Sequence, residues 1–485
     1  MSRSSPASTF LERTGIALRG GGASLSLGVA CLAAYLWAVH SFDAPLAVPA
    51  MVVAVLASLT APGGLRLPLP LIIFLVWLAW CAIGITVTAY PGTVTDTVWE
   101  YAKVGVLLFV VTNICRTPNQ VVLAAAIWLA LFILYPMRGT YLNFLFGHSF
   151  VGRYSWNRTF GQPNDLAAFT LLAIGLSLFL LQLRTGMRAV RLAMFGTLGG
   201  LALLVILTQS RGGFLALSVA SLTYLAASKK RFQYLAGALV VAAVVAAVAP
   251  ESVWSRFRGI RDLSPSDQLG QVDASADQRY TIQLVALSMV KDHPLYGVGV
   301  GAYSLEHEID ATERREWLAA RGPRDTHNMY LNLAAETGLP GLALFVAMLA
   351  TTIASALRAE RQMRPAWPHG AEALRSLRFG LIAYLLAAVL GTFHRSSFLF
   401  VYLGLLSAAT TALPGLVSTR ASSTFPALAP VSRRRWAASF TRRFRSPSIT
   451  PSGVATSAVG PVPGTNRTVR FARQLRVTRR SVRVR

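Results

Sequence analysis

The sequence predicts an all-α membrane protein with about 12 transmembrane helices, and three observations support this fold class. Of its 485 residues, 54% are apolar and only 14% are charged, whereas a soluble protein carries about 25% charged residues. The apolar residues form blocks of roughly 20, the length a helix needs to cross a bilayer. Arginines and lysines gather between alternate blocks. Together these features exclude a soluble globular protein.

The apolar blocks define one transmembrane domain over 23–413, preceded by a short segment over 1–22. Block 98–115 contains Glu100 and Lys103, and block 212–227 is short, so these two fit the pattern least well. The predicted spans are residues 23–41, 44–62, 68–90, 98–115, 119–137, 165–183, 190–208, 212–227, 232–249, 339–357, 376–393 and 397–413.

Basic residues in the short connections predict the orientation of the chain. Loops rich in Lys and Arg stay in the cytoplasm. An even number of spans then puts both termini on the cytoplasmic side. The basic residues on that side are Arg3, Arg13, Arg19, Arg66, Arg116, Arg184, Arg188, Arg191, Lys229, Lys230, Arg231, Arg358, Arg361, Arg364, Arg375 and Arg378.

The opposite side is predicted to carry one large loop, at about 250–338, between the ninth and tenth spans. It contains thirteen of the twenty acidic residues. Loops beyond about 15 residues are usually functional or disordered. Apolar residues at helical spacing from Ile282 to Met289 indicate a folded, partly helical loop. A second loop, at 138–164, holds Arg138, Arg153 and Arg158.

The C-terminal segment 414–485 is rich in Ser, Pro, Thr and Arg. From Leu413 onward it contains fifteen arginines and no acidic residue. This composition predicts a disordered cytoplasmic tail, which either contacts anionic lipid headgroups or is a solvated extension. The chain's net charge of +26 is therefore no sign of nucleic-acid binding, for which the sequence has no reading motif.

On the non-cytoplasmic side, where the positive-inside rule predicts few arginines, three sequences break the rule, and two of them centre on Arg211 and Arg279. Arg211 belongs to a polar sequence, Thr208–Gly213, between two apolar blocks. A guanidinium there needs a partner or water, and its planar fork suits a phosphate. Snorkelling at a helix end is the alternative. Arg279, in Asp277–Tyr280, is either a second such group or a surface arginine paired with Asp277 or Asp273.

A histidine in the same large loop is the candidate base. His327 lies in Arg324–Tyr330, just before an apolar block. Imidazole is the side chain best suited to take a proton near neutral pH, although a loop histidine can also be simple polar surface. His293, His307 and His394 are rivals on the same side.

Two glycine-containing sequences and the cysteines call for no cofactor. Gly297–Gly301 is not flanked by the strand and helix of a nucleotide loop, so we expect a flexible or tightly turning segment. Gly161–Asn164 is expected to cap the next helix. The three cysteines have no metal-ligand spacing.

Three motifs together resemble the O-antigen ligase and polymerase superfamily. They are SRGG from Ser210, HPLYGVGVGAY from His293, and THNMYLNLAAETGLPG from Thr326, each at a span boundary. The resemblance covers about 25–413 in organisation and about 150–345 in motifs. It implies a bacterial inner-membrane, metal-independent, inverting glycosyltransferase that needs no cofactor and has its active site outside the cytoplasm.

The resemblance also implies substrates and roles. The donor is a glycan on a polyprenyl diphosphate, and the acceptor is a hydroxyl of a lipid or a glycan. Arg211, Arg279 and His327 match the family's functional trio, in which two guanidiniums stabilise the leaving diphosphate and the imidazole deprotonates the acceptor. We further expect substrate binding by the polar or basic residues Ser210, Asn328, Arg153, Arg158 and Lys103.

The motifs leave other functions open. A polymerase extending glycan on the same carrier and a protein O-oligosaccharyltransferase would share donor and mechanism with a ligase. A transporter would need ionisable or broken-helix features deep in several spans, and here the spans are mostly free of them.

Overall fold

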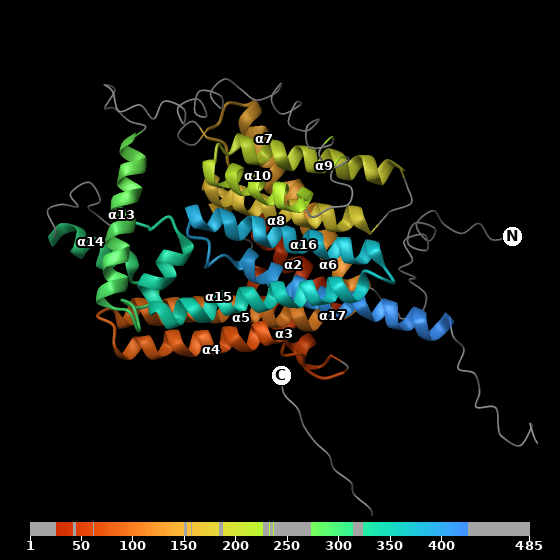
Figure 1. Cartoon of the computed structure of the whole chain (residues 1–485), viewed down its shortest axis with the longest axis horizontal. Coiled ribbons are helices and arrows are strands. Elements are labelled where there is room, and N and C mark those ends of the chain that lie inside the picture. Colours follow the sequence, from red (N-terminus) through yellow and green to blue (C-terminus); the bar gives the residue numbers. More distant parts are fainter. Residues whose placement is uncertain are drawn as a thin grey trace, which may run out of the picture. The chain divides into compact units, whose positions relative to one another are not determined.

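The computed structural model describes residues 26–41, 45–61, 63–149, 153–156, 158–183, 188–226, 232, 236, 273–313 and 324–424. These belong to the first of two compact units, Met1–Phe425, and helices dominate them, as the sequence predicts (Figure 1). The predicted span 232–249, most of the first half of the large loop, and the tail beyond 424 lie outside this part.

The helices of the described part are α2 Leu27–Ser41, α3 Ala47–Leu59, α4 Leu69–Ile83, α5 Pro91–Ile114, α6 Pro118–Phe132, α7 Arg138–Leu145, α8 Pro163–Gln182, α9 Arg188–Leu207, α10 Arg211–Ala226, α13 Asp273–Asp292, α14 Tyr303–Glu313, α15 Met329–Met363, α16 Pro368–Ala387 and α17 Ser397–Thr424. Most of them follow the apolar blocks in order, whereas α7, α13 and α14 lie in the predicted loops. Short turns include η1 Gly84–Thr86, η2 Ile133–Met137, η3 Arg158–Phe160 and η5 Ala388–Leu390.

Eight helices of the described part are long and apolar enough to cross a membrane, and α2 and α3 are shorter apolar helices. The chain is thus a multi-pass helical membrane protein. Four helices begin with proline: Pro91, Pro118, Pro163 and Pro368. Proline suits the first helical turn because its missing N–H would have no partner there.

Several helices are longer than their apolar blocks. Helix α15 begins at Met329, ten residues before the predicted span, so the large loop ends earlier than 338. Helix α17 continues to Thr424, past the predicted boundary at 413. Pro118–Leu145 is continuous through the π turn η2, so Arg138 opens α7 rather than a loop. Hydropathy does not register polar turns at the ends of helices.

Helices α8, α16 and α17 form the best-buried part of the bundle. Gly175 on α8 and Gly380 on α16 meet so closely that a Cβ on either would collide with the other's backbone. The hydroxyl of Tyr402 on α17 lies at the same crossing and donates to the Leu377 carbonyl at 2.8 Å. Small residues allow such close helix contacts in membranes, where dispersion replaces the hydrophobic effect.

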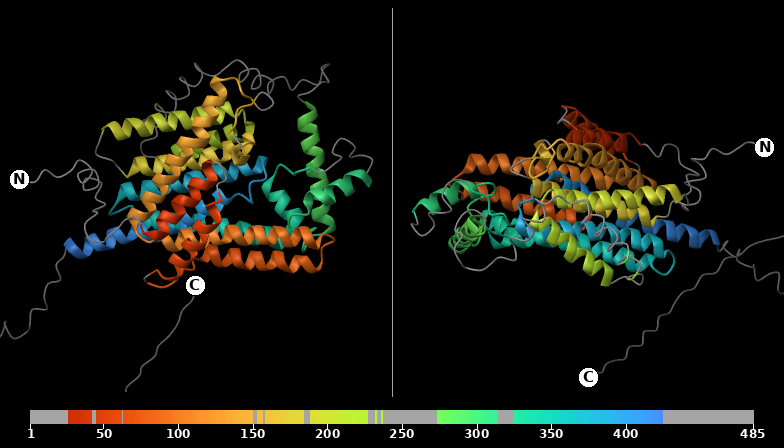
Figure 2. Two further views of the ribbon diagram at one scale, coloured as in Figure 1. Left: turned by 180° about the vertical axis from the view of Figure 1, so that it is seen from behind. Right: turned by 90° about the horizontal axis from the view of Figure 1, so that it is seen from above.

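Helices α13 and α14 lie at one end of the bundle, and α13 runs across the direction of the long helices (Figures 1 and 2). We call this the α13 end, and the opposite one the far end. Helix α15 starts at the α13 end and runs to the far end.

The glycine-rich segment 293–302 attaches the loop to α15. Its Val298 and Gly299 N–H groups donate to the carbonyls of Ala335 and Glu336 at 2.9 and 3.0 Å. Helix α15 is kinked at Gly338, whose φ of 69° and ψ of 178° are accessible almost only to glycine. Of the two expectations, the tight turn is therefore the one present, and it packs against the kink.

The far end carries arginines that the sequence assigned to one side. The 63–66 and 113–116 connections meet there, because Arg116 donates to the Gly64 carbonyl at 2.7 Å and the Arg66 N–H to Asn113 Oδ1 at 2.8 Å. This agrees with the predicted common side of Arg66 and Arg116. Its assignment to the cytoplasm stays a prediction.

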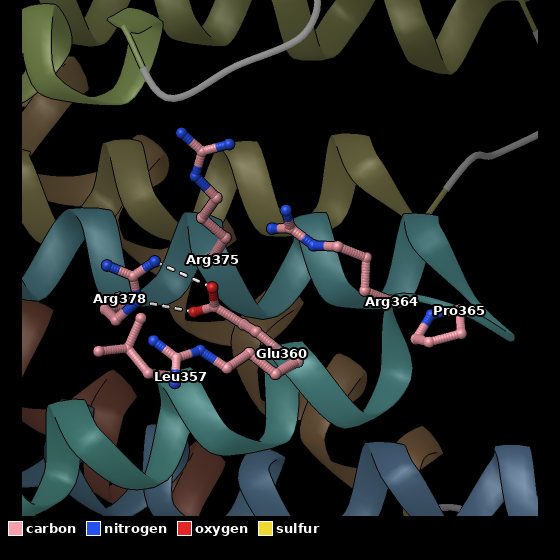
Figure 3. A pocket seen from close by; sticks show the side chains of 7 residues that line it. Leu357, Glu360, Arg364, Pro365, Arg375 and Arg378 are labelled. Carbon is pink, nitrogen blue, oxygen red and sulfur yellow. Dashed lines mark hydrogen bonds and ion pairs between the residues drawn. The ribbon is translucent and has the colours of Figure 1, made fainter.

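An ion pair joins α15 to α16 at the far end. Arg378 donates through Nε and Nη2 to both oxygens of Glu360, at 2.6 and 2.9 Å (Figure 3). Arg375 points away from that carboxylate and donates to the Tyr224 carbonyl at 2.7 Å, with its guanidinium over the Tyr224 ring. Glu360 borders a cavity of about 430 Å³.

Candidate active site

Two backbone positions at the α13 end have an unusual conformation. Among the described residues, Gln209 and His327 are the two non-glycine residues with positive φ, 48° and 52°. Such positions are uncommon, and they cluster at functional sites, where the surrounding structure holds them. One lies in the SRGG motif loop and the other is the candidate base. The local backbone thus draws attention to the same two motifs as the sequence.

The Arg211 loop is a tight connection between α9 and α10. Helix α9 ends at Leu207 and α10 starts at Arg211. The buried Ser210 hydroxyl accepts a hydrogen bond from the Gly213 N–H at 3.2 Å, as a helix cap does. The Arg211 side chain is exposed. The loop therefore presents a guanidinium beside a helix N-terminus, a combination that attracts anions.

Arg153 supports this loop from behind. Its Nε donates to the Thr208 carbonyl at 2.9 Å, and its Nη2 donates to Asn164 Oδ1 at 2.7 Å. It therefore ties the Arg211 loop to the start of α8. We predicted substrate binding by Arg153, and the geometry gives it a positioning role. The side chain of Arg158 is outside the described part of the chain.

Arg279 on α13 lies within electrostatic range of both Arg211 and His327. Burial lowers the pKa of the half-buried Arg279, and the charge of Arg211 lowers it further. Burial also lowers the pKa of His327; the charges of Arg279 and Arg324 lower it too, while Asp325 raises it. The fold thus brings together three residues that are far apart in the sequence. No carboxylate of the described residues forms an ion pair with Arg211 or Arg279.

The His327 loop is fixed by its two neighbours. The Asn328 side chain accepts from the Tyr330 and Leu331 N–H groups at 3.0 and 3.1 Å and so caps α15. The buried Thr326 hydroxyl bonds with the Asn328 carbonyl at 3.0 Å. Ser210 and Asn328, both predicted to bind substrate, therefore each cap a helix whose first residues belong to the site.

A buried polar cluster lies beside the trio, and sequence reasoning missed most of it. Glu336 is 2% exposed and accepts from Arg395 Nη2 at 3.0 Å. His394 is 3% exposed, and its Nε2 lies 4.0 Å from the other Glu336 oxygen. Burial and the Arg395 charge lower the pKa of His394 to about 3. The imidazole is therefore neutral, and the 4.0 Å approach is no ion pair.

Two signals in the sequence could have revealed this cluster. Glu336 is an acidic residue at the edge of an apolar block, which is costly without a partner. Arg395 lies between two spans on the predicted non-cytoplasmic side, where arginines are rare. Of the rival histidines, His394 joins the cluster, His307 is buried in α14 and His293 is exposed after α13.

The cluster borders two cavities at the α13 end. One, of about 400 Å³, is lined by residues that include Arg324, Asp325, Glu336 and Arg395. The other, of about 200 Å³, is lined by Lys103, Glu100 and Arg395 among others. Lys103, on α5, therefore lines the same cavity as Arg395. Within the described residues, no group of three or more His, Cys, Asp or Glu could hold a metal ion.

Helices long and apolar enough to span a membrane and a charged site at one end of them define the class: a multi-pass membrane protein with a polar site at one end of its helices. Residues 196–346 match the family model described as O-antigen ligase. This match confirms the predicted resemblance to the O-antigen ligase and polymerase superfamily over that part of the chain. It includes Arg211, Arg279 and His327. No curated protein matches the chain.

Proposed function

We propose that this protein transfers a glycan, with inversion, from a polyprenyl diphosphate to a hydroxyl of an acceptor outside the cytoplasm, as an O-antigen ligase does. The observation that carries the proposal is the electrostatic proximity of Arg279 to both Arg211 and His327 at the α13 end. Two cations that form no ion pair with a carboxylate of the described residues suit a diphosphate, and an imidazole whose pKa is lowered suits an alcohol.

The two arginines would act on the leaving group. As the bond between the anomeric carbon and the diphosphate oxygen breaks, the electron pair goes to that oxygen. Arg211 and Arg279 then stabilise the new negative charge, and the N-terminus of α10 adds its partial positive charge. The Arg279 guanidinium also lowers the pKa of His327.

His327 would act on the acceptor. Its imidazole takes the proton of the acceptor hydroxyl while that oxygen attacks the anomeric carbon from the face opposite the diphosphate. This role requires a neutral imidazole. Burial and the guanidiniums of Arg279 and Arg324 lower the pKa of His327, so a larger fraction of the imidazole is neutral near pH 7 than in an unperturbed histidine.

The orientation belongs to the same proposal. With both termini in the cytoplasm of a bacterium, the α13 end faces away from the cytoplasm, where the carrier's diphosphate sits at the membrane surface. Arg153 holds the Arg211 loop, and Lys103 helps to guide the anionic donor. The basic tail contacts anionic lipid on the cytoplasmic side.

Reconstitution tests this function. The purified full-length protein in liposomes is supplied with a donor, a glycan on polyprenyl diphosphate. Three acceptors are then tested in separate reactions: a lipid-linked sugar, a carrier-linked glycan and a hydroxyl-bearing protein. A new glycolipid with release of polyprenyl diphosphate is the expected result. Longer carrier-linked chains would identify a polymerase, and a glycosylated protein an oligosaccharyltransferase. No transfer to any acceptor would overturn the proposal.

A further inference from the structure

The proposed binding of the diphosphate by Arg211 and Arg279 does not involve the cavity of about 400 Å³ at the α13 end. Neither Arg211 nor Arg279 lines it. Its walls come from three segments that the sequence separates: the start of α14, the His327 loop with the first turns of α15, and the connection before α17. It is therefore a second polar site, built next to the trio.

The charges of this cavity balance. Arg324 and Arg395 contribute two positive charges, and Asp325 and Glu336 contribute two negative ones. A diphosphate is attracted to a net positive site such as the Arg211 and Arg279 pair, not to a neutral one. Sugar hydroxyls both donate and accept hydrogen bonds, so a wall of mixed donors and acceptors suits a neutral sugar.

Buried polar atoms in this wall lack hydrogen-bond partners among the described residues. They are Glu336 Oε2 and both ring nitrogens of His394. An unmade hydrogen bond on a buried group costs about 1–3 kcal/mol. Glu336 Oε2 and His394 Nε2 are 4.0 Å apart, so one hydroxyl oxygen can lie about 2.8 Å from each. That hydroxyl would donate to the carboxylate and accept from a protonated Nε2.

The cavity continues into the loop that carries the base. Arg324 and Asp325, which line it, directly precede His327. Asp325 accepts a hydrogen bond from Thr392, and Asn332 bonds with Thr326 at 3.2 Å. A sugar held in this cavity therefore lies beside the residue proposed to deprotonate the nucleophile, while the diphosphate lies at the two arginines.

We propose that this cavity binds the acceptor's terminal sugar, a neutral polyhydroxylated ring, and that Glu336 and His394 recognise one of its hydroxyls. The inference rests on the proposed function, because it assigns the nucleophile's side of the same reaction. Arg395 holds Glu336 in place through its hydrogen bond. The second oxygen of that carboxylate would accept a hydrogen bond from the sugar.

Glu336→Gln tests the recognition directly. The amide oxygen can still accept from Arg395, but the second acceptor oxygen is replaced by an amide N–H donor. With the full-length protein in nanodiscs, we expect the KM for the acceptor to rise about tenfold or more, as loss of a hydrogen bond to a charged group predicts, and the KM for the donor to stay unchanged. Thr392→Val, a milder change in the same wall, should shift the acceptor KM in the same direction.

Glu360→Gln is the matched control. Glu360 is also buried, on the same helix and paired with an arginine, but it lies at the far end. KM does not depend on the fraction of folded molecules, so a merely destabilising change leaves it unaltered. Unchanged acceptor KM in both cavity variants would overturn the inference. A rise in donor KM alone would also overturn it and assign the cavity to the donor's sugar.

A binding measurement separates this inference from the proposed function. Saturation-transfer NMR with free acceptor monosaccharides and no donor should show contact with the wild-type protein that weakens in Glu336→Gln. Absence of transfer by the wild type, with sugar binding intact, would contradict the function alone. Transfer by the wild type with equal sugar binding in all variants would contradict the cavity assignment alone.

Discussion

Helix α15 carries a buried, arginine-paired glutamate toward each of its ends, and the two differ in one respect. Glu360 at the far end is 3% exposed, and both of its oxygens accept from Arg378. Glu336 at the α13 end is 2% exposed, but Arg395 uses only one of its oxygens. Both border cavities of similar volume, about 430 and 400 Å³. Volume therefore does not distinguish a binding site from a structural contact, whereas an unused acceptor does.

The largest expected effect comes from replacing His327, the proposed base at the α13 end. His327→Ala should lower kcat by about 10²–10⁴, the usual contribution of a general base, while insertion and folding stay normal. Single-turnover transfer in liposomes with a defined lipid-linked donor measures it. His293→Ala, at an exposed position after α13, is the control and should keep wild-type transfer. Full transfer by the His327 variant would remove this residue from its role.

Arg211→Lys should have the next largest effect. Lysine keeps the charge but loses the planar fork that binds a phosphate through two hydrogen bonds, so we expect about a hundredfold loss of kcat/KM. Arg364→Lys, at the exposed far end, should change nothing. If both variants transferred glycan equally well, charge alone would suffice, and the assigned contact with the diphosphate would be wrong.

Glu360→Gln sharpens the comparison by affecting stability alone. Breaking a buried ion pair that uses both carboxylate oxygens costs about 3 kcal/mol. The apparent melting temperature in detergent should therefore fall, whereas the KM values for donor and acceptor should not change. An altered acceptor KM in this variant would mean that the two ends of α15 are coupled, and the distinction between them would not hold.

The smallest effect is a pair of opposite pH shifts. The charge of Arg324 lowers the pKa of His327 and that of Asp325 raises it. Since the neutral imidazole is the active form, transfer is lost as the pH falls through this pKa. Arg324→Gln should raise the pKa, so activity is lost at a higher pH. Asp325→Asn should lower it, so activity persists to a lower pH. The pH profile of kcat/KM would have to shift in both directions.

Much of the fold was predictable because the length of the apolar blocks and the distribution of Lys and Arg between them can be taken directly from the sequence. The helices α4, α6, α8 and α9 lie where the apolar blocks predict them. The first turns of α15, before residue 339, were missed because Asn332, Glu336 and Thr337 interrupt their apolar residues. Apolar length also gave no sign that Pro118–Leu145 continues through a π turn at Pro136.

The site residues that each belong to a single sequence motif could be predicted. The sequence named Arg211, Arg279 and His327, and the fold brings them close together, while their roles stay predictions. It could not pair Glu336 with Arg395, because 59 positions separate them and only the packing of α15 beside the start of α17 makes them neighbours. It also could not show that Ser210 and Asn328 use their side chains as helix caps.

The kink at Gly338 has a consequence for how this region can vary. The segment 293–302 holds α15 through main-chain groups: the N–H groups of Val298 and Gly299 on one side, and the Leu339 N–H donating to the Pro294 carbonyl at 2.8 Å on the other. These contacts depend on the course of the main chain and not on the identity of the side chains. Val298 can therefore be replaced by other small residues without loss of these hydrogen bonds. A single methyl group added at Gly338 would instead collide with the Leu295 carbonyl and break them.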